Sequence, residues 1–189
     1  MSRQEQLARI QLELADAKGR AHEIAAPLKN ELWGTRPAPD QWSVAECLIH
    51  LNLTSRAFLP LIKDAIGAGH HRESFGGASY RMDFVGRLLW WAATVRLPLK
   101  TTGPFVPLCA QPKDTVLSEF DALQTQLMGW VKEADGLDLC KRRIVSPFDS
   151  RLGYNLYSCL RLIPAHQRQH LRQAERVIDR LRTGLRAPG

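Results

Sequence analysis

Two histidines four positions apart near the end of the chain, His166 and His170, are the residues best suited to chemistry. At about 100° per residue on a helix they lie about 40° apart, on the side that carries Ile163, Ala174 and Val177. Both imidazoles are therefore expected to point toward a core, where neutral ring nitrogens can bind a divalent metal at about 2.0 to 2.1 Å. Alone the pair is a weak motif, and two hydrogen-bonded core histidines explain it equally well. The residues between them include no glutamate, which disfavours a His-Glu-x-x-His metalloprotease.

A third histidine, His50, changes the interpretation of this pair. It lies two turns into an expected helix that begins with a capping box formed by Ser43 and Glu46. A single histidine there is usually a satisfied polar group at the edge of a core. Three inward histidines from two helices of a bundle instead make a three-nitrogen site with a position open for water or substrate. Glu46 could also orient His50 or act as a base, although capping the helix is its favoured explanation.

Four amphipathic helices are needed to position these side chains, and the spacing of apolar residues predicts them. Apolar positions repeat at steps of three and four, and strand-like alternation is absent. We expect an all-α four-helix bundle, a fold whose core can hold a metal. Pro60 is expected to bend the second helix, and Pro164 marks either the start of the last helix or a kink in it. The expected helices cover residues 7–28, 44–66, 113–136 and 156–184.

Residues 70–111, between the second and third helices, form an extra helix or a long insertion in this interpretation. Arg81–Leu99 could be a fifth helix, and its run from Leu88 to Trp91 is apolar on too many sides for an isolated surface helix. Packing across the bundle or in a dimer interface is favoured over binding to a membrane surface. His70 and His71 lie among glycines and are interpreted as loop residues.

Length and composition fit one packed domain. We expect a single domain over residues 1–184 and a flexible tail over 185–189. A hydrophobic fraction of 44% with 24% charged residues excludes a disordered chain. We expect no transmembrane segment, no secretory signal and a cytoplasmic location, because no apolar run has the required length. The four cysteines form no CxxC pair and are expected to be free thiols.

The net charge of +7 belongs mainly to the C-terminal segment, where seven arginines follow residue 160. A basic helix face can bind nucleic acid or another polyanion by neutralising phosphates. No aromatic residues interleave with this stripe, however, and Glu175 and Asp179 interrupt it. We therefore expect no specific nucleic acid partner and interpret the stripe as a solvated face.

Two segments of the chain resemble the DinB-like superfamily of bacterial four-helix proteins. They are residues 42–51, WSVAECLIHL, and residues 164–171, PAHQRQHL. Trp33 and the helix continuing to Leu181 fit as well, so the resemblance covers most of the chain. It implies that His50, His166 and His170 hold a divalent metal, often nickel or zinc. Characterised relatives include metal-dependent thiol S-transferases and isomerases that use low-molecular-weight thiols.

These observations together predict a metal-dependent enzyme that activates water or a low-molecular-weight thiol. The expected activity is that of a hydrolase or a thiol S-transferase with a small-molecule substrate, and we expect a homodimer. A non-catalytic, metal-stabilised module and a polyanion-binding protein are the alternatives. Cys47 and Cys159 are minor candidates for a fourth ligand, while Tyr154, Asn155 and Tyr157 could line a pocket or serve packing.

Overall fold

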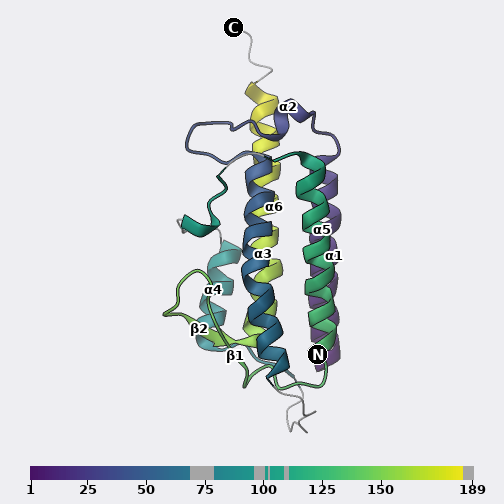
Figure 1. Ribbon diagram of the computed structural model, residues 1–189, viewed down its shortest axis with the longest axis vertical. Coiled ribbons are helices and arrows are strands. Elements are labelled where there is room, and N and C mark those ends of the chain that lie inside the picture. The colour runs from purple at the N-terminus through teal and green to yellow at the C-terminus, as the bar shows by residue number, and fades with distance from the viewer. Residues whose placement is uncertain (69–78, 96–100, 102, 109–110, 185–189) are drawn as a thin grey trace.

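Four long helices build the described part of the protein, which in the computed structural model comprises residues 1–68, 79–95, 101, 103–108 and 111–184. Figure 1 shows them packed lengthwise, with a shorter helix, α4 (Phe84–Val95), outside the bundle. The long helices are α1 (Arg3–Ala25), α3 (Val44–Gly67), α5 (Lys113–Glu133) and α6 (Leu156–Gly184). The expected all-α bundle with an additional helix between its second and third helices is confirmed.

The helices run up, down, down and up through the bundle (Figure 1). The start of α5 lies beside the end of α1: there the ammonium of Lys113 donates hydrogen bonds to the carbonyl oxygens of Ala25 and Leu28, at 3.2 and 2.8 Å. α3 and α5 are therefore parallel neighbours. Parallel helices that follow one another in the sequence require a long crossing connection. The segment between α3 and α5, which contains α4 and the short 3-10 helix η1 (Gly103–Phe105), supplies it.

The capping box predicted at Ser43 and the buried face predicted for the first helix are both present in the structure. Ser43 accepts a hydrogen bond from the Glu46 backbone N–H, and the Glu46 carboxylate accepts one from the Ser43 backbone N–H at 2.8 Å. Ser2 and Glu5 form the same capping box at the start of α1. Together these caps satisfy amide groups that have no partner inside a helix. The predicted seam of the first helix is buried throughout: Leu7, Ile10, Leu14, Ala17, Ala21, Ile24 and Leu28.

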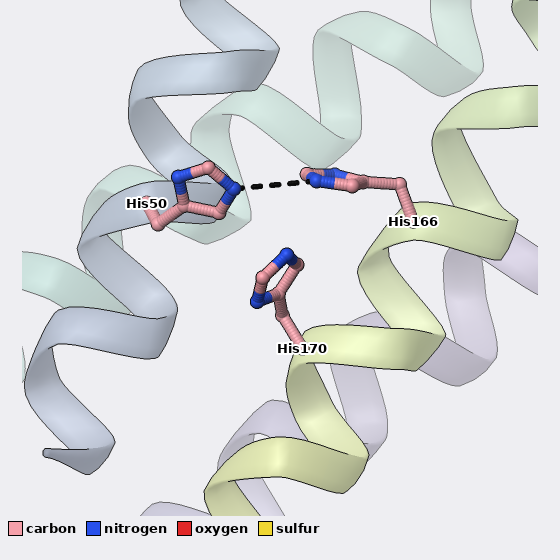
Figure 2. Close-up of side chains that lie close together, drawn as sticks. All are labelled: His50, His166 and His170. Carbon is pink, nitrogen blue, oxygen red and sulfur yellow. Dashed lines mark hydrogen bonds between the residues drawn. The ribbon is translucent and has the colours of Figure 1, made fainter. Parts of the chain in front are cut away.

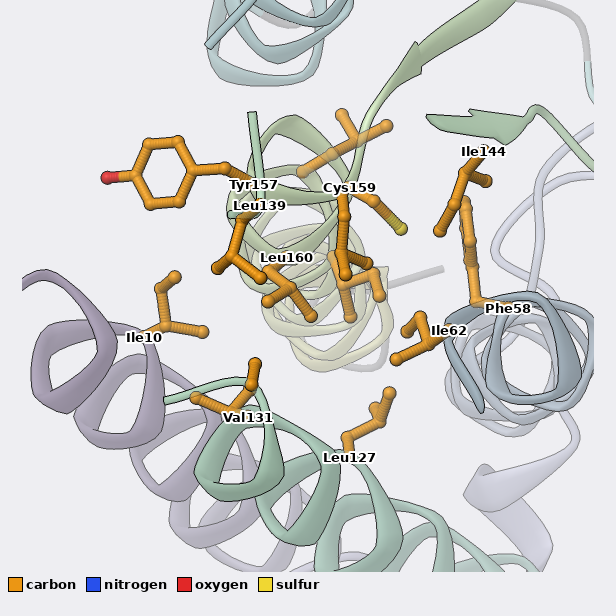
Figure 3. Packing of buried hydrophobic residues seen from close by; sticks show 14 of the residues in the cluster. Ile10, Phe58, Ile62, Leu127, Val131, Leu139, Ile144, Tyr157, Cys159 and Leu160 are labelled. Carbon is orange, nitrogen blue, oxygen red and sulfur yellow. The ribbon is translucent and has the colours of Figure 1, made fainter. Parts of the chain in front are cut away.

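The apolar core consists of two clusters, one in each half of the bundle. Figure 3 shows the first, in which side chains of α1, α3, α5 and α6 converge around Leu160. On α6 the first cluster reaches Ile163 and the second begins at Leu171. On α3 the second cluster reaches Leu51 and the first begins at Phe58. On α3 and α6, buried polar residues such as Asn52, Thr54 and Gln167 lie between the two clusters, in the middle of the bundle.

Helix α4 is held against the start of α6 by Asp83. Its carboxylate accepts hydrogen bonds from the Gly86 backbone N–H at 2.9 Å, the Ser158 hydroxyl at 3.0 Å and the Asn155 backbone N–H at 2.8 Å. Gly86 permits the close approach, since a Cβ atom at this position would lie 2.2 Å from the Cβ of Ser158. The outer connection is thus tied to the helix that carries His166.

Several features differ from the prediction made from the sequence. Two three-residue strands, β1 (Arg143–Val145) and β2 (Gly153–Asn155), pair antiparallel just before α6, although no strands were expected. Three residues are too few for alternation to be recognised. The last helix starts at Leu156 as expected, so Pro164 lies inside α6 and does not mark its start. The third helix ends at Glu133, and Gly136 adopts a positive φ of 81° in the following turn. A short helix, α2 (Asn30–Trp33), was not predicted.

Some expectations concern residues outside the described ranges: His70, His71, Cys109, the last part of the proposed fifth helix and the tail at 185–189. Within the described residues, no helix combines the length and the apolar character needed to cross a membrane.

Candidate metal centre

The structure brings the three predicted histidines together near the middle of the bundle. His50 comes from α3, while His166 and His170 come from successive turns of α6. One ring nitrogen from each lies within 4.8 Å of the others, and the two Nε2 atoms of His50 and His166 are 3.2 Å apart. Figure 2 shows the three rings pointing into one common space between the two helices. Their role as metal ligands stays a prediction.

The geometry of this group fits a metal ion. Two nitrogens bound to one tetrahedral ion at 2.0 to 2.1 Å lie about 3.3 Å apart, close to the separation of the His50 and His166 atoms. Three imidazoles form a donor set that suits zinc, nickel, copper or iron. Within the described residues, no carboxylate or thiolate belongs to the cluster. The chain can therefore offer three neutral nitrogens to a divalent cation.

Two of the rings are oriented by hydrogen bonds on the side away from the common space. His50 Nδ1 lies 2.7 Å from the backbone carbonyl oxygen of Phe105, in η1, and His170 Nδ1 lies 3.0 Å from the side-chain oxygen of Gln173. Because oxygen accepts, both Nδ1 atoms carry the proton, and each Nε2 presents a lone pair to the centre. Bonds of this kind fix the tautomer of metal-binding histidines.

Electrostatics keep the three rings neutral. Burial lowers the pKa of His50 and outweighs the hydrogen bond to Phe105, which raises it. Burial, followed by the neighbouring His50, lowers the pKa of His170 to about 3. The pKa of His166 is also well below its ordinary value, because of burial and of the two neighbouring histidines. Near neutral pH all three imidazoles are therefore unprotonated, as a metal ligand must be.

Aromatic side chains line the two sides of the cluster. The ring of Trp42 lies 5.0 Å from that of His50 and 5.8 Å from that of His170, measured between centroids. On the other side, Phe148 lies 5.9 Å from His166 and packs edge-on against Phe105 at 4.7 Å. Trp42 and Phe148 are half-buried, so they form apolar walls that still reach solvent.

A buried pair of glutamines fixes the rotation of α6 at this level. Gln167 follows His166, and its side-chain amide exchanges two hydrogen bonds with that of Gln124 on α5, at 2.9 and 3.0 Å. Gln124 also donates to the backbone carbonyl of Leu14 on α1, at 3.1 Å. With Gln167 directed toward α1 and α5, the neighbouring His166 is turned toward α3.

Glu46, the proposed base or support for His50, has the contacts of a helix cap. Its carboxylate accepts hydrogen bonds from Ser43 and from the guanidinium of Arg36, whose Nε lies 2.9 Å from Oε2. Burial would raise the pKa of Glu46, but these hydrogen bonds outweigh it and leave the pKa below its ordinary value. A general base near neutral pH needs a raised pKa instead. A catalytic role of Glu46 stays a prediction that its contacts do not favour.

The two cysteines considered as a fourth ligand do not belong to the three-histidine cluster. Cys47 and Cys159 are buried free thiols, and burial raises the pKa of each, which disfavours a thiolate ligand. Tyr154 is buried in the core, and Tyr157 accepts a hydrogen bond at 3.0 Å from the side-chain amide of Gln6. Both tyrosines serve packing. His22 is exposed on α1 and pairs with Asp121.

The sequence interpretation missed three residues that contact the histidines: Phe105, Phe148 and Gln173. Phe105 and Phe148 lie in connecting segments, whose position no periodicity predicts. Gln173 carried a usable signal, because it is three positions after His170 and therefore on the same helix face.

Comparison with known proteins identifies the family. A family model described as the DinB superfamily matches residues 13–174. The chain belongs to the DinB superfamily. No curated protein and no solved structure shows a significant match to it. The region matched by the DinB model contains His50, His166 and His170 together with all four long helices in whole or in part. Membership in the DinB superfamily is compatible with a metal site at this cluster.

Proposed function

We propose that His50, His166 and His170 hold one divalent metal ion, nickel or zinc, and that the protein is a metal-dependent enzyme acting on a small molecule. The convergence of three neutral ring nitrogens, two of them oriented by hydrogen bonds from Nδ1, carries this proposal. A divalent ion on neutral ligands supplies Lewis-acid chemistry and lowers the pKa of a water or thiol that binds it.

The chain's own residues have separate roles in this proposal. Phe105 and Gln173 hold two of the imidazoles in the tautomer that faces the centre. Trp42 and Phe148 place apolar surface beside the reacting groups, which strengthens electrostatic interactions by excluding water. Apolar walls of this kind favour a small apolar or aromatic substrate over a large polar one.

Two reactions agree with this arrangement: hydrolysis, and transfer of a low-molecular-weight thiol. We favour thiol transfer. Among the described residues, the carboxylate nearest in sequence to a ligand, Glu46, is held ionised by Arg36 and is a poor base for activating water. In thiol transfer the thiol loses its proton to solvent, its sulfur bonds to an electrophilic carbon, and the leaving group departs with the bonding electrons.

The decisive experiment compares metal-free and metal-loaded protein with a panel of small thiols and electrophiles, and with ester and amide substrates. The protein is purified without nickel resin or chelator, and its metal content is determined by elemental analysis. We expect turnover to require metal and to be lost in His50→Ala but kept in His22→Ala, since His22 is exposed on α1. Equal rates with and without metal would remove the enzymatic proposal.

A metal-stabilised module without turnover is the second candidate, because the cluster joins α3 to α6. It predicts that metal raises the unfolding temperature while no substrate in the panel reacts.

Polyanion binding has less support from the arginine contacts. Arg161 and Arg168 approach the carboxylate of Glu13 on α1 at 3.4 and 3.7 Å, so protein groups already share their charge. This alternative predicts duplex DNA binding that weakens steeply with salt, with a smaller slope in the Arg168→Ala, Arg172→Ala variant.

A further inference from the structure

Helix α4 carries an apolar stripe on its outer face. Its members are Phe84, Leu88, Trp91 and Val95, with exposed fractions of 79, 54, 50 and 45%. At about 100° per residue they fall within about 60° of one another, so they form a single line along the helix. The opposite face is already used, since Val85, Leu89 and Ala93 pack against the core. The stripe is therefore a second apolar face with no role in the bundle.

The spacing of this stripe is that of a helix-pairing seam. Its residues are separated by four, three and four positions, the alternation by which two helices pack side by side in a coiled coil. Gly86, which would interrupt such a seam, lies on the inner side against Ser158. The outer line is thus continuous over the whole helix.

We propose that the protein forms a homodimer in which the two α4 helices pack antiparallel through this stripe. A two-fold axis between Leu88 and Trp91 pairs each of these residues with the other on the partner subunit, and pairs Phe84 with Val95. The largest side chain, Trp91, then lies near the centre of the contact, where burial contributes most to binding.

The exposed area of the stripe is large enough for an interface with a second copy of the chain. Its exposed surface is roughly 500 Å², at the upper range for the largest patch on a typical monomer. Two copies bury about 1,000 Å², which reaches the lower limit of a specific interface. Flanking residues of α4 add to this area, so the contact is sufficient for a modest dimer.

The small number of charged residues in α4 favours packing of the stripe against a second copy of the chain over binding to a membrane surface. Helices that lie on membranes combine an apolar face with a strongly charged opposite face. Of the residues of α4, Arg87 alone is charged, and the face opposite the stripe is packed on the bundle. A pair of such helices brings no acidic or basic side chains into its centre.

Sedimentation velocity over a wide range of protein concentration tests the proposal. We expect the unmodified chain to sediment with the mass of two chains at high concentration, and Leu88→Glu and Trp91→Glu to sediment as monomers with unchanged helix content. Leu12→Glu is the matched control, because Leu12 is 71% exposed on α1, away from the stripe. It should remain dimeric. A monomeric unmodified chain, or dimeric Leu88→Glu and Trp91→Glu variants, would overturn the proposal.

A charge exchange tests the antiparallel direction. A Leu88→Lys chain and a Trp91→Glu chain should each be monomeric, and their equimolar mixture should form a heterodimer, because position 88 meets position 91 of the partner subunit. Failure of the mixture to associate would overturn the antiparallel arrangement. Sedimentation of a monomeric unmodified chain with anionic phospholipid vesicles would assign the stripe to a lipid surface instead.

Discussion

The Nε2 atoms of His50 and His166 lie 3.2 Å apart, although 116 positions separate the two residues in the chain. The Nδ1 proton of His50 is directed to the Phe105 carbonyl, so its Nε2 faces His166 with a lone pair. The third ring, His170, lies 4.4 Å from His50 and 4.6 Å from His166, measured between centroids. Hydrogen bonds from His50 to Phe105, between His50 and His166, and from His170 to Gln173 give these buried imidazoles polar partners, which lowers the cost of burying them.

The first prediction concerns metal stoichiometry. We expect one divalent ion per chain, and we expect the His166→Ala, His170→Ala double variant to lose it, because one imidazole alone does not form a stoichiometric site. Elemental analysis after dialysis measures the loss. His22→Ala is the control, since it removes an exposed histidine that pairs with Asp121. Full metal retention in the double variant contradicts the site.

The second prediction concerns Gln173, which orients His170. Gln173→Leu removes the acceptor for the Nδ1 proton and should weaken metal binding by about 10- to 100-fold while one ion still binds at saturation. Competition titration with a chromophoric chelator measures the affinity. Gln126→Leu, on the exposed face of α5, makes the same change away from the cluster and should leave affinity unaltered. Equal affinities of the two variants contradict an orienting role for Gln173.

Much of the bundle and of the cluster was predictable because both follow from helix periodicity. The seam from Leu7 to Leu28 and the capping box at Ser43 identify helices whose burial the structure confirms. The i, i+4 spacing places His166 and His170 on one face.

Contacts made by short or irregular segments were not predictable in the same way. Phe105 reaches His50 from a three-residue 3-10 helix, and Phe148 follows a three-residue strand. Their positions depend on how the connections fold back on the bundle, which has no periodic signature. The break between the two core clusters also becomes apparent only when the four helices are aligned in space.

The third prediction concerns the seat of α4. Gly86→Ala should lower the free energy of unfolding by about 1 to 3 kcal/mol, because its new methyl group would overlap Ser158 and push α4 from α6. Gly129→Ala in α5 is the matched control, with nothing within 4 Å of the added Cβ. It should instead raise stability by about 0.5 to 1 kcal/mol, since alanine favours a helix. Urea denaturation measures both; equal effects contradict the close approach.

The last prediction concerns the stability of the metal-free protein in acid. The pKa values of the three histidines are lowered in the folded state, that of His170 to about 3, whereas an unfolded histidine titrates near pH 6.5. Below about pH 6.5 the unfolded chain therefore binds more protons than the folded one, and stability falls as the pH falls. Each histidine contributes up to about 1.4 kcal/mol per pH unit within this window.

Urea denaturation at about pH 7 and about pH 5 measures this loss before the carboxylates begin to titrate. His170→Asn should reduce the pH dependence, because the variant has one fewer group that gains a proton on unfolding. His22→Ala should keep most of it, since His22 is exposed and pairs with Asp121 instead of lying in the cluster. The same pH dependence in His170→Asn as in the unmodified chain would show that the ring at this position is not held neutral by the fold.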